Sequence, residues 1–276
     1  GKSQMSKFYT HQKDMLRYSL SHPHCCYLAD VGTGKTRPSI ATFYLRKEKG
    51  TGLTRFDKRT ERDIEKCLVV CPSNIIENWT REIDKMELGL TFSMIVGPKK
   101  KRLAALDVEA DFYIVNYDYL SRITAELIGM GFDMVIVDEI TYVKYHGTNR
   151  SRALRLITKD IPYRIGLTGS PITNSPMDAF AEFWVIHDRL FGTNFWQFRN
   201  RYFQNKGYYY PDWQPRKDQM DELADKIGDY SIRVKKEDCL DLPPVVFETR
   251  EIEMPAKMKQ DYREMKEQLV LEIGEE

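Results

Sequence analysis

Short apolar runs alternate with longer segments of mixed polarity over the first 170 residues of the chain. Runs this short, rich in branched side chains, are typical of buried strands, whereas apolar residues spaced three or four apart predict helices. The expected strands are residues 25–28, 67–71, 92–96, 111–116, 132–137 and 163–167. The expected helices are residues 39–46, 75–86, 99–106, 119–128 and 152–157.

The order of these elements predicts the fold class. Strands that alternate with helices form a mostly parallel sheet covered on both faces, so we expect an α/β domain. Ser73 or Asn74 is expected to cap the helix that follows the second strand. Residues 46–66 are charged, lack an apolar period and contain two glycines, which is typical of a surface loop.

The character of the sequence changes after Pro176. Residues 177–206 combine many aromatic side chains with interspersed arginines. Such mixtures can stack on nucleic-acid bases, but aromatic residues at helical spacing more often form a helix core, which is the interpretation we favour. We therefore expect a helical insertion at about 177–230, with a loop at 208–211 and a polar helix at 219–227. A strand at 245–247 and a last helix from Pro255 are expected to follow it.

The composition limits the classes of protein to consider but does not indicate a function. The chain has 276 residues, of which 42% are hydrophobic and 30% charged, and its net charge of +1 means that any nucleic-acid surface must be local. The five cysteines are odd in number and lie mostly in apolar runs, and no run resembles a signal peptide or a membrane span. We expect a monomer in an intracellular, reducing compartment, with no membrane partner.

The first chemical signal is the stretch ADVGTGKT at residues 29–36, which lies between an apolar run and an expected helix. This is the context of a phosphate-binding loop, in which Gly32 and Gly34 turn backbone N–H groups toward an anion at the helix N-terminus. Lys35 is expected to reach the β- and γ-phosphates of ATP, and the Thr36 hydroxyl to ligate Mg²⁺. The alternative is a glycine turn in which Lys35 is a solvated charge.

Gln12, upstream of this loop, is a further candidate. Its amide offers a donor and an acceptor and could read the adenine edge, with Phe8 or Tyr9 covering the base. The alternative is a glutamine that faces solvent on the first turn of a helix. The candidate nucleotide-binding residues are Gln12, Gly32, Thr33, Gly34, Lys35 and Thr36.

The second chemical signal is the acidic pair Asp138 and Glu139, which follows the apolar run at 132–137. The carboxyl ends of parallel strands share one edge of a sheet, so these acids are expected to face the phosphate loop. Asp138 would hold Mg²⁺ there, Glu139 would polarise the attacking water, and Lys35 completes the candidate catalytic set. The alternative is a solvated strand end whose acids cap the next segment.

These motifs, in this order, resemble the Swi/Snf-type ATPases of helicase superfamily two. Gln12 stands where that family has its adenine-reading glutamine, and DVGTGKT at 30–36 is similar to motif I. The further matches are VVCPSNIIENWTRE at 69–82 to motif Ia, VNYD at 115–118 to motif Ib, DE at 138–139 to motif II, LTGSPITNS at 167–175 to motif III, and RVKKEDCLDLPP at 233–244 to the segment after the family's first inserted helices. The resemblance covers nearly the whole chain, and motifs Ia and III are its most specific parts.

The resemblance implies a RecA-like P-loop lobe over residues 1–254 and a helical bridge over residues 255–276 toward a second RecA-like lobe. Two departures accompany it. Ile140 and Thr141 follow the acidic pair where the family has Ala-His, so the histidine's link to motif III would fall to Thr141. Motifs IV to VI, which belong to a second lobe with arginine fingers, are absent from the sequence.

The function that the resemblance implies is ATP-driven translocation along double-stranded DNA without strand separation. DNA phosphates would meet N–H groups and hydroxyls near Ser73, Asn74, Asn116 and Thr168. A first lobe alone is expected to bind ATP–Mg²⁺ weakly and to hydrolyse it slowly, because an arginine finger adds orders of magnitude in rate. Two alternatives stay open: a restriction-type translocase or unwinding helicase of the same superfamily, and a catalytically idle DNA- or protein-binding module.

Overall fold

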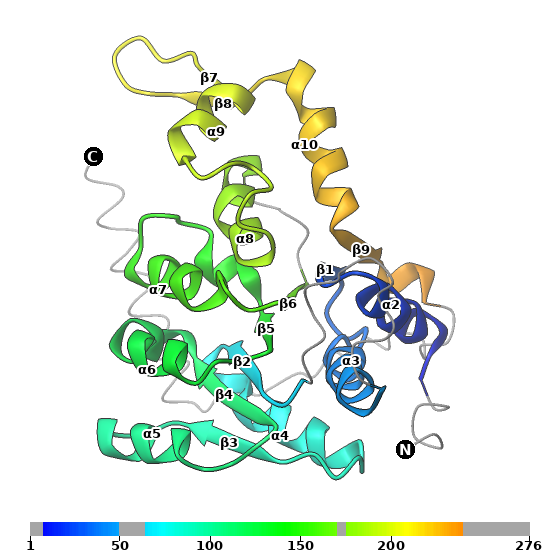
Figure 1. Cartoon of the computed structure of the whole chain (residues 1–276). Coiled ribbons are helices and arrows are strands. Elements are labelled where there is room, and N and C mark those ends of the chain that lie inside the picture. The colour runs from blue at the N-terminus through cyan, green and yellow to red at the C-terminus, as the bar shows by residue number, and fades with distance from the viewer. Residues whose placement is uncertain (1–7, 50–63, 170–174, 240–276) are drawn as a thin grey trace, which may run out of the picture. The chain divides into compact units, whose positions relative to one another are not determined.

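The centre of the molecule is a seven-stranded sheet with the order β3-β4-β2-β5-β6-β1-β9, in which neighbouring strands run parallel (Figure 1). The computed structural model describes residues 8–49, 64–169 and 175–239. The strands of the sheet are β1 (His24–Ala29), β2 (Cys67–Cys71), β3 (Phe92–Ile95), β4 (Phe112–Asn116), β5 (Met134–Asp138), β6 (Tyr163–Thr168) and β9 (Ser231–Val234). This arrangement confirms the predicted α/β class.

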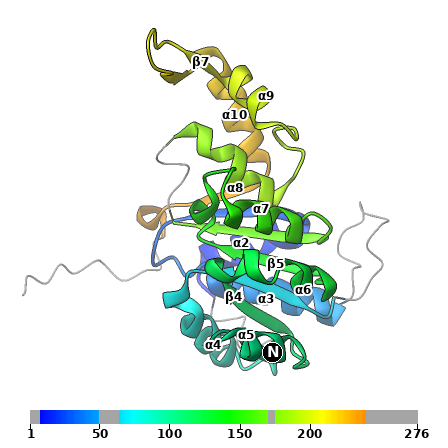
Figure 2. The same cartoon turned by 90° about the vertical axis from the view of Figure 1, so that its left-hand side faces the viewer.

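Helices cover both faces of the sheet, as the sequence predicts. Alternate strand residues enter two separate apolar clusters: in β2, Leu68 and Val70 join one cluster, and Cys67 and Val69 join the other. The second cluster packs against α2 (Thr10–Ser21), α3 (Thr36–Lys49) and α4 (Ile76–Lys85). The first packs against α5 (Lys99–Leu106), α6 (Thr124–Gly129), α7 (Asn149–Thr158) and α8 (Ala179–Ile186), on the opposite side of the sheet (Figure 2).

The sheet order places three strand ends beside one another. In the register of the sheet, Leu28 of β1 lies opposite Thr168 of β6, and Asp138 of β5 lies opposite Leu167 of β6. Because all three strands run in the same direction, the segments that follow them leave the sheet at one edge. The loop after β1 and the acidic pair at the end of β5 therefore meet at the same edge.

The residues after β6 form an insertion that is not purely helical. It contains η4 (Pro176–Asp178), α8, α9 (Phe195–Tyr202), the strands β7 (Phe203–Asn205) and β8 (Trp213–Pro215), and α10 (Lys217–Asp229). The sequence did not predict the antiparallel hairpin of β7 and β8, because three-residue strands are too short to show an alternating pattern. The prediction that the aromatic residues form a core is confirmed for Phe180, Phe183, Phe198, Tyr202 and Phe203, whereas Trp196 is exposed.

Two of the predicted helices begin with a 3-10 turn that the sequence did not predict. Residues 119–128 form the 3-10 helix η2 (Tyr117–Arg122) and then α6, because the Asn116 side chain accepts hydrogen bonds from the N–H groups of Asp118 and Tyr119 and tightens the first turn. Residues 73–75 form a second 3-10 turn, η1, and α4 starts after it without a side-chain cap. The prediction that Ser73 or Asn74 caps this helix was therefore wrong.

Two further predictions of the chain's local structure were incomplete. Residues 46–49 continue α3 rather than starting a surface loop, because Arg46 is buried, donates to the carbonyls of Ser19 and Leu20, and lies 4.0 Å from the centre of the Tyr163 ring. The edge strand β9 was not predicted at all. The strand expected at 245–247, the helix expected from Pro255, most of the loop at 46–66 and residues 170–174 of motif III lie outside the described residues.

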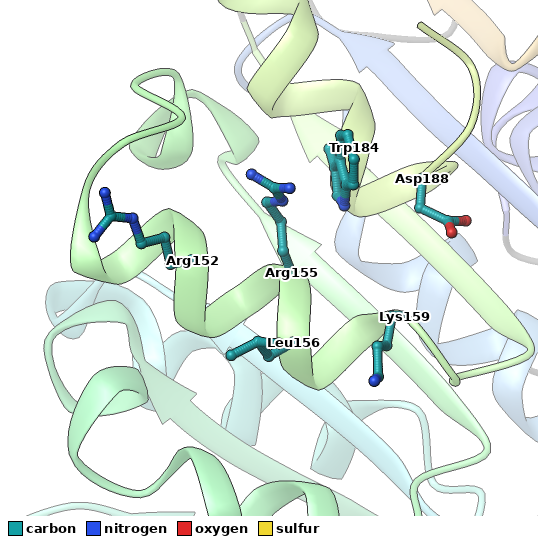
Figure 3. A pocket seen from close by; sticks show the side chains of 6 residues that line it. All are labelled: Arg152, Arg155, Leu156, Lys159, Trp184 and Asp188. Carbon is teal, nitrogen blue, oxygen red and sulfur yellow. The ribbon is translucent and has the colours of Figure 1, made fainter. Parts of the chain in front are cut away.

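A contact between α7 and α8 ties the start of the insertion to the sheet. Here a cavity of about 410 Å³ is lined by three cationic side chains, Arg152 and Arg155 of α7 and Lys159, which follows α7 (Figure 3). The Arg155 guanidinium lies 3.8 Å from the centre of the Trp184 ring, a cation–π contact, and burial lowers the pKa of Arg155. Within the described residues, none of the helices combines the length and the apolar character needed to cross a membrane.

Candidate nucleotide-binding site

A cavity of about 510 Å³ lies at the edge of the sheet where β1 and β5 end. It brings together the phosphate-loop stretch, the start of α4 and the acidic pair, which are far apart in the sequence. Its lining residues are Asp30, Val31, Gly32, Gly34, Lys35, Thr36, Arg37, Pro72, Asn74, Ile75, Asn78, Glu82, Asp138, Glu139 and Tyr142.

The loop after β1 has the backbone that its glycines predict. Gly32 and Gly34 have φ angles of 89° and 72°, in the left-handed region that favours glycine. A Cβ atom on Gly34 would displace the Gln12 amide nitrogen from the loop. The Thr33 hydroxyl donates to the carbonyl of Asp30 at 2.8 Å and closes the turn. Asp30 in turn accepts a 2.9 Å hydrogen bond from the N–H of Lys236, beyond β9.

Gln12 is buried against this loop rather than facing solvent. Its amide nitrogen donates to the Gly34 carbonyl at 3.1 Å, and its amide oxygen accepts from the N–H of Tyr9 at 3.2 Å. His11, one residue earlier, contacts the Thr33 carbonyl at 2.8 Å. The first turn of α2 therefore supports the phosphate loop, a role that the sequence did not predict.

Lys35 and Thr36 stand at the start of α3 and line the cavity. The Lys35 ammonium makes a 3.4 Å contact with the Ala29 carbonyl, at the long end of hydrogen-bond distances. Because this contact is weak, the flexible Lys35 ammonium is available to bind an anion that enters the cavity.

Asp138 is buried at the end of β5 and is held by Trp79 of α4. The Trp79 indole N–H donates to Asp138 Oδ2 at 2.9 Å, and Trp79 itself is completely buried. Burial raises the pKa of Asp138, while the hydrogen bond from Trp79 and the charge of Lys35 act to lower it. The sequence identified motif Ia, which contains Trp79, as specific, but not this contact, which joins residues 59 positions apart.

Glu139 is fixed by two hydroxyl groups. Thr141 donates to Glu139 Oε1 at 2.9 Å and Thr168, at the end of β6, donates to the same oxygen at 3.0 Å. Thr141 thus contacts the acidic pair from the position where the resembled family has histidine, and Thr168 connects that pair to the first residues of motif III.

The backbone at Glu139 is unusual. Its φ of 59° is in the left-handed region, which is uncommon for a residue with a side chain and is often found at functional sites. The Tyr117 hydroxyl donates to the carbonyl of Asp138 at 2.7 Å and contacts that of Glu139 at 3.1 Å. These bonds hold the bend that aims the Glu139 side chain.

The four residues proposed to lie near DNA fall into two groups. Ser73 and Asn74 are exposed on η1, and Asn74 also lines the cavity. Asn116 is buried and caps η2, and Thr168 is buried with its hydroxyl on Glu139. Only Ser73 and Asn74 therefore present exposed side chains, whereas Asn116 and Thr168 have structural contacts within the lobe.

Comparison with known proteins agrees with this arrangement. A family model for the SNF2-related domain matches residues 11–276. The chain belongs to the SNF2-related domain family. It is accordingly a Swi/Snf-type ATPase domain of helicase superfamily two, in the part that corresponds to the N-terminal lobe.

Several relatives of this SNF2-related domain have names that refer to DNA. The "DNA annealing helicase and endonuclease ZRANB3" of Bos taurus is 28% identical over 262 residues, which are 91% of this chain and 23% of the relative. RAD54, a DNA repair and recombination protein of Saccharomyces cerevisiae, is 27% identical over 188 residues, or 61% of this chain and 20% of the relative. The chain thus spans about a quarter or less of these relatives' lengths.

A solved structure shares the fold of the SNF2-related domain. It is the Sulfolobus solfataricus SWI2/SNF2 ATPase core in complex with double-stranded DNA, with a TM-score of 0.67 and 21% identity. The match covers 83% of this chain and 45% of that chain. It supports the RecA-like fold expected from the sequence.

The residues of the cavity fit a magnesium–nucleotide complex. The two left-handed glycines have no side chains where phosphates would approach, and two cations, Lys35 and Arg37, line the cavity together with four carboxylates, among them Asp138 and Glu139. Mg²⁺ is usually bound by one or two protein oxygens together with phosphate oxygens and waters. Thr36 and Asp138 would supply the protein oxygens here. The described residues hold no group of three or more His, Cys, Asp or Glu placed to bind a metal ion by themselves.

The buried carboxyl group of Glu182 on α8 is expected to make the stability of the lobe depend on pH. Its side chain is 2% exposed, and its Oε2 atom has no hydrogen-bond partner among the described residues. Burial, with the charges of Asp178 and Glu139, raises the pKa of Glu182 to about 7. Between about pH 4.5 and pH 7 the folded chain retains a proton that the unfolded chain releases, so the free energy of unfolding falls as pH rises.

We expect Glu182→Gln to be more stable than the wild type by about 1–3 kcal/mol at about pH 8 and nearly equal to it at about pH 4. Glutamine removes the ionisation but keeps the shape of the side chain. Urea unfolding at the two pH values measures the difference, and Glu109→Gln, at an exposed position, is the control. A stability difference that is the same at both pH values would contradict the prediction.

Proposed function

We propose that this lobe binds ATP–Mg²⁺ in the cavity at the edge of the sheet and serves as the first lobe of a motor that translocates on double-stranded DNA. The observation that supports the proposal best is the Glu139 carboxylate, held by two hydroxyls beside Lys35 and Asp138 in one cavity. A strand end that is merely solvated has no need for that arrangement. The names of the relatives, which refer to DNA repair and helicase activity, favour DNA as the track.

Each residue has a distinct part in the proposed chemistry. Lys35 neutralises negative charge on the β- and γ-phosphates, and the N–H groups around Gly32 and Gly34 cradle them. Bound magnesium would neutralise charge that develops on the phosphates. Asp138 would offer one carboxylate oxygen to the metal, and the Trp79 indole N–H donates to the other. Glu139 orients and polarises the attacking water and takes up its proton.

Gln12 and the exposed residues of η1 complete the proposal. Gln12 reads adenine if its amide exchanges the Tyr9 or Gly34 contact for the base edge. Ser73 and Asn74 offer a hydroxyl, an amide and backbone N–H groups to DNA phosphates next to the nucleotide cavity. Asn116 and Thr168 act indirectly, by holding η2 and Glu139 in place.

ATP turnover with and without duplex DNA tests the proposed function. This chain alone is expected to hydrolyse ATP slowly, whereas a longer protein that carries it together with a second RecA-like lobe should be stimulated by duplex DNA, because the second lobe supplies arginine fingers. Turnover by the chain alone that equals the two-lobed rate would contradict the two-lobe account. DNA binding without any hydrolysis in the two-lobed protein would favour the idle-module alternative.

A further inference from the structure

The tip of the β7–β8 hairpin carries an exposed aromatic surface that the nucleotide site does not explain. Tyr208, Tyr209 and Tyr210 are 91%, 87% and 85% exposed. The hairpin lies at the end of the insertion beyond α9, away from the seven-stranded sheet (Figures 1 and 2). Exposed large aromatic residues in a row are unusual on a soluble domain and commonly mark a contact surface.

The loop that carries the tyrosines is built to present them. The Asn205 side-chain oxygen accepts hydrogen bonds from the N–H groups of Gly207 and Asp212 at 3.0 and 2.8 Å, and the N–H of Lys206 donates to the Asp212 carbonyl at 2.8 Å. A Cβ atom on Gly207 would lie 1.7 Å from the Tyr210 carbonyl oxygen, so the turn requires glycine. The backbone is thus fixed, and the three rings are exposed, with Tyr208 and Tyr209 in an edge-to-face contact at 4.8 Å between ring centres.

The base of the hairpin is also ordered by aromatic and cationic side chains. The Arg199 guanidinium of α9 lies 3.6 Å from the centre of the Trp213 ring on β8 and 4.6 Å from that of the Trp196 ring. Arg216 donates through Nε to the Phe203 carbonyl across the hairpin at 3.1 Å. The position of the tyrosine tip relative to α9 is therefore set by packing.

The charge of this surface favours a polyanion as its partner. Residues 194–217 contain five Lys or Arg residues and one acid, Asp212; Arg201 is paired with Glu222 of α10 at 2.8 Å, and the other four cations are Arg199, Lys206, Arg216 and Lys217. Among the described residues, Lys206 has no ion-pair partner, and it lies two residues before Tyr208. Aromatic rings beside cations are the combination with which proteins bind single-stranded nucleic acid, the rings stacking on bases and the cations meeting phosphates.

We propose that Tyr208, Tyr209 and Tyr210 form a stacking platform for unpaired DNA bases next to a duplex. The faces of bases inside a duplex are covered by their neighbours, so exposed rings can stack only on bases that are unpaired. The inference rests on the proposed function, because DNA is the track assumed there. It adds that the chain distinguishes DNA with a single-stranded arm from a blunt duplex.

Equilibrium binding of fluorescent DNA tests this proposal. The intact chain is expected to bind a duplex with a single-stranded arm about tenfold more tightly than a blunt duplex of the same paired length. The variant with Tyr208→Ala, Tyr209→Ala and Tyr210→Ala should lose this preference and keep its blunt-duplex affinity and its melting temperature. The variant with phenylalanine at the same three positions should keep the preference, because the ring and not the hydroxyl stacks.

A 2-aminopurine base in the single-stranded arm gives a second readout, because stacking on an aromatic ring quenches its fluorescence. Quenching by the intact chain and by the phenylalanine variant, but not by the alanine variant, is the expected result. An alanine variant that retains the arm preference would overturn the proposal, as would equal binding of armed and blunt DNA by the intact chain. If the chain binds neither the armed nor the blunt duplex, the proposed function itself fails. Failure of the proposed function is therefore distinguishable from failure of the stacking proposal alone.

Discussion

Replacing Glu139 by glutamine is expected to lower the rate of ATP hydrolysis by about 10²–10⁴-fold and to leave ATP binding nearly unchanged. Glutamine keeps the shape of the side chain and can still accept from Thr141 and Thr168, but it cannot take a proton from the attacking water. The rate is measured in a two-lobed protein that carries this chain, with duplex DNA present, so that hydrolysis is fast enough to quantify.

Matched variants of the two threonines separate the role of Glu139 from that of its supports. Thr168→Val removes one hydroxyl from Glu139 Oε1 and keeps the volume of the side chain, and Thr141→Val removes the other. Each should slow hydrolysis by about tenfold, because one charge-assisted hydrogen bond is lost while the carboxylate remains. If Glu139→Gln retained the wild-type rate, Glu139 would not be the base, whatever the threonine variants showed.

Much of the central fold was predictable because its signals are local. The strands β2, β4, β5 and β6 are short apolar runs buried on both faces, and a parallel sheet is the arrangement that accommodates them. The two glycines of the phosphate loop stand at left-handed positions, as a loop that turns its N–H groups outward requires. The order of the strands placed this loop and the acidic pair on one edge.

What the sequence could not predict depends on contacts between distant residues. The Trp79–Asp138 and Thr168–Glu139 hydrogen bonds join separate elements. Nothing in the sequence around Trp79 or Thr168 indicates which carboxylate each of them contacts. Likewise β9 pairs with β1 at the edge of the sheet, and the alternation of polar and apolar residues at 231–234 spans only four positions, too few to distinguish a strand by itself.

The same reason explains the errors in the insertion and at the helix starts. Each strand of the hairpin β7–β8 is three residues long and is stabilised by pairing and by Arg199 between two tryptophans, so its sequence shows no period. The aromatic run was predicted as core, which holds for α8 and α9, while Tyr208–Tyr210 of the loop are exposed.

Lys35→Ala is expected to weaken binding of ATP–Mg²⁺ by about 100-fold or more. The ammonium lines the cavity beside both carboxylates, and its 3.4 Å contact with the Ala29 carbonyl is easily exchanged for phosphate oxygens. A hydrogen bond between two charged groups contributes about 1.5–3 kcal/mol, and the loss of two such bonds to the β- and γ-phosphates corresponds to this fall in affinity.

Calorimetric titration of this chain with ATP, with and without magnesium, tests the central claim most directly. The intact chain should bind ATP more tightly with magnesium than without it, and Lys35→Ala should show no measurable binding. Lys159→Ala, which removes the same charge from the separate cavity between α7 and α8, should bind like the intact chain. Equal affinities for the intact chain and Lys35→Ala, or no binding by the intact chain, would contradict the assignment of this cavity as the nucleotide site.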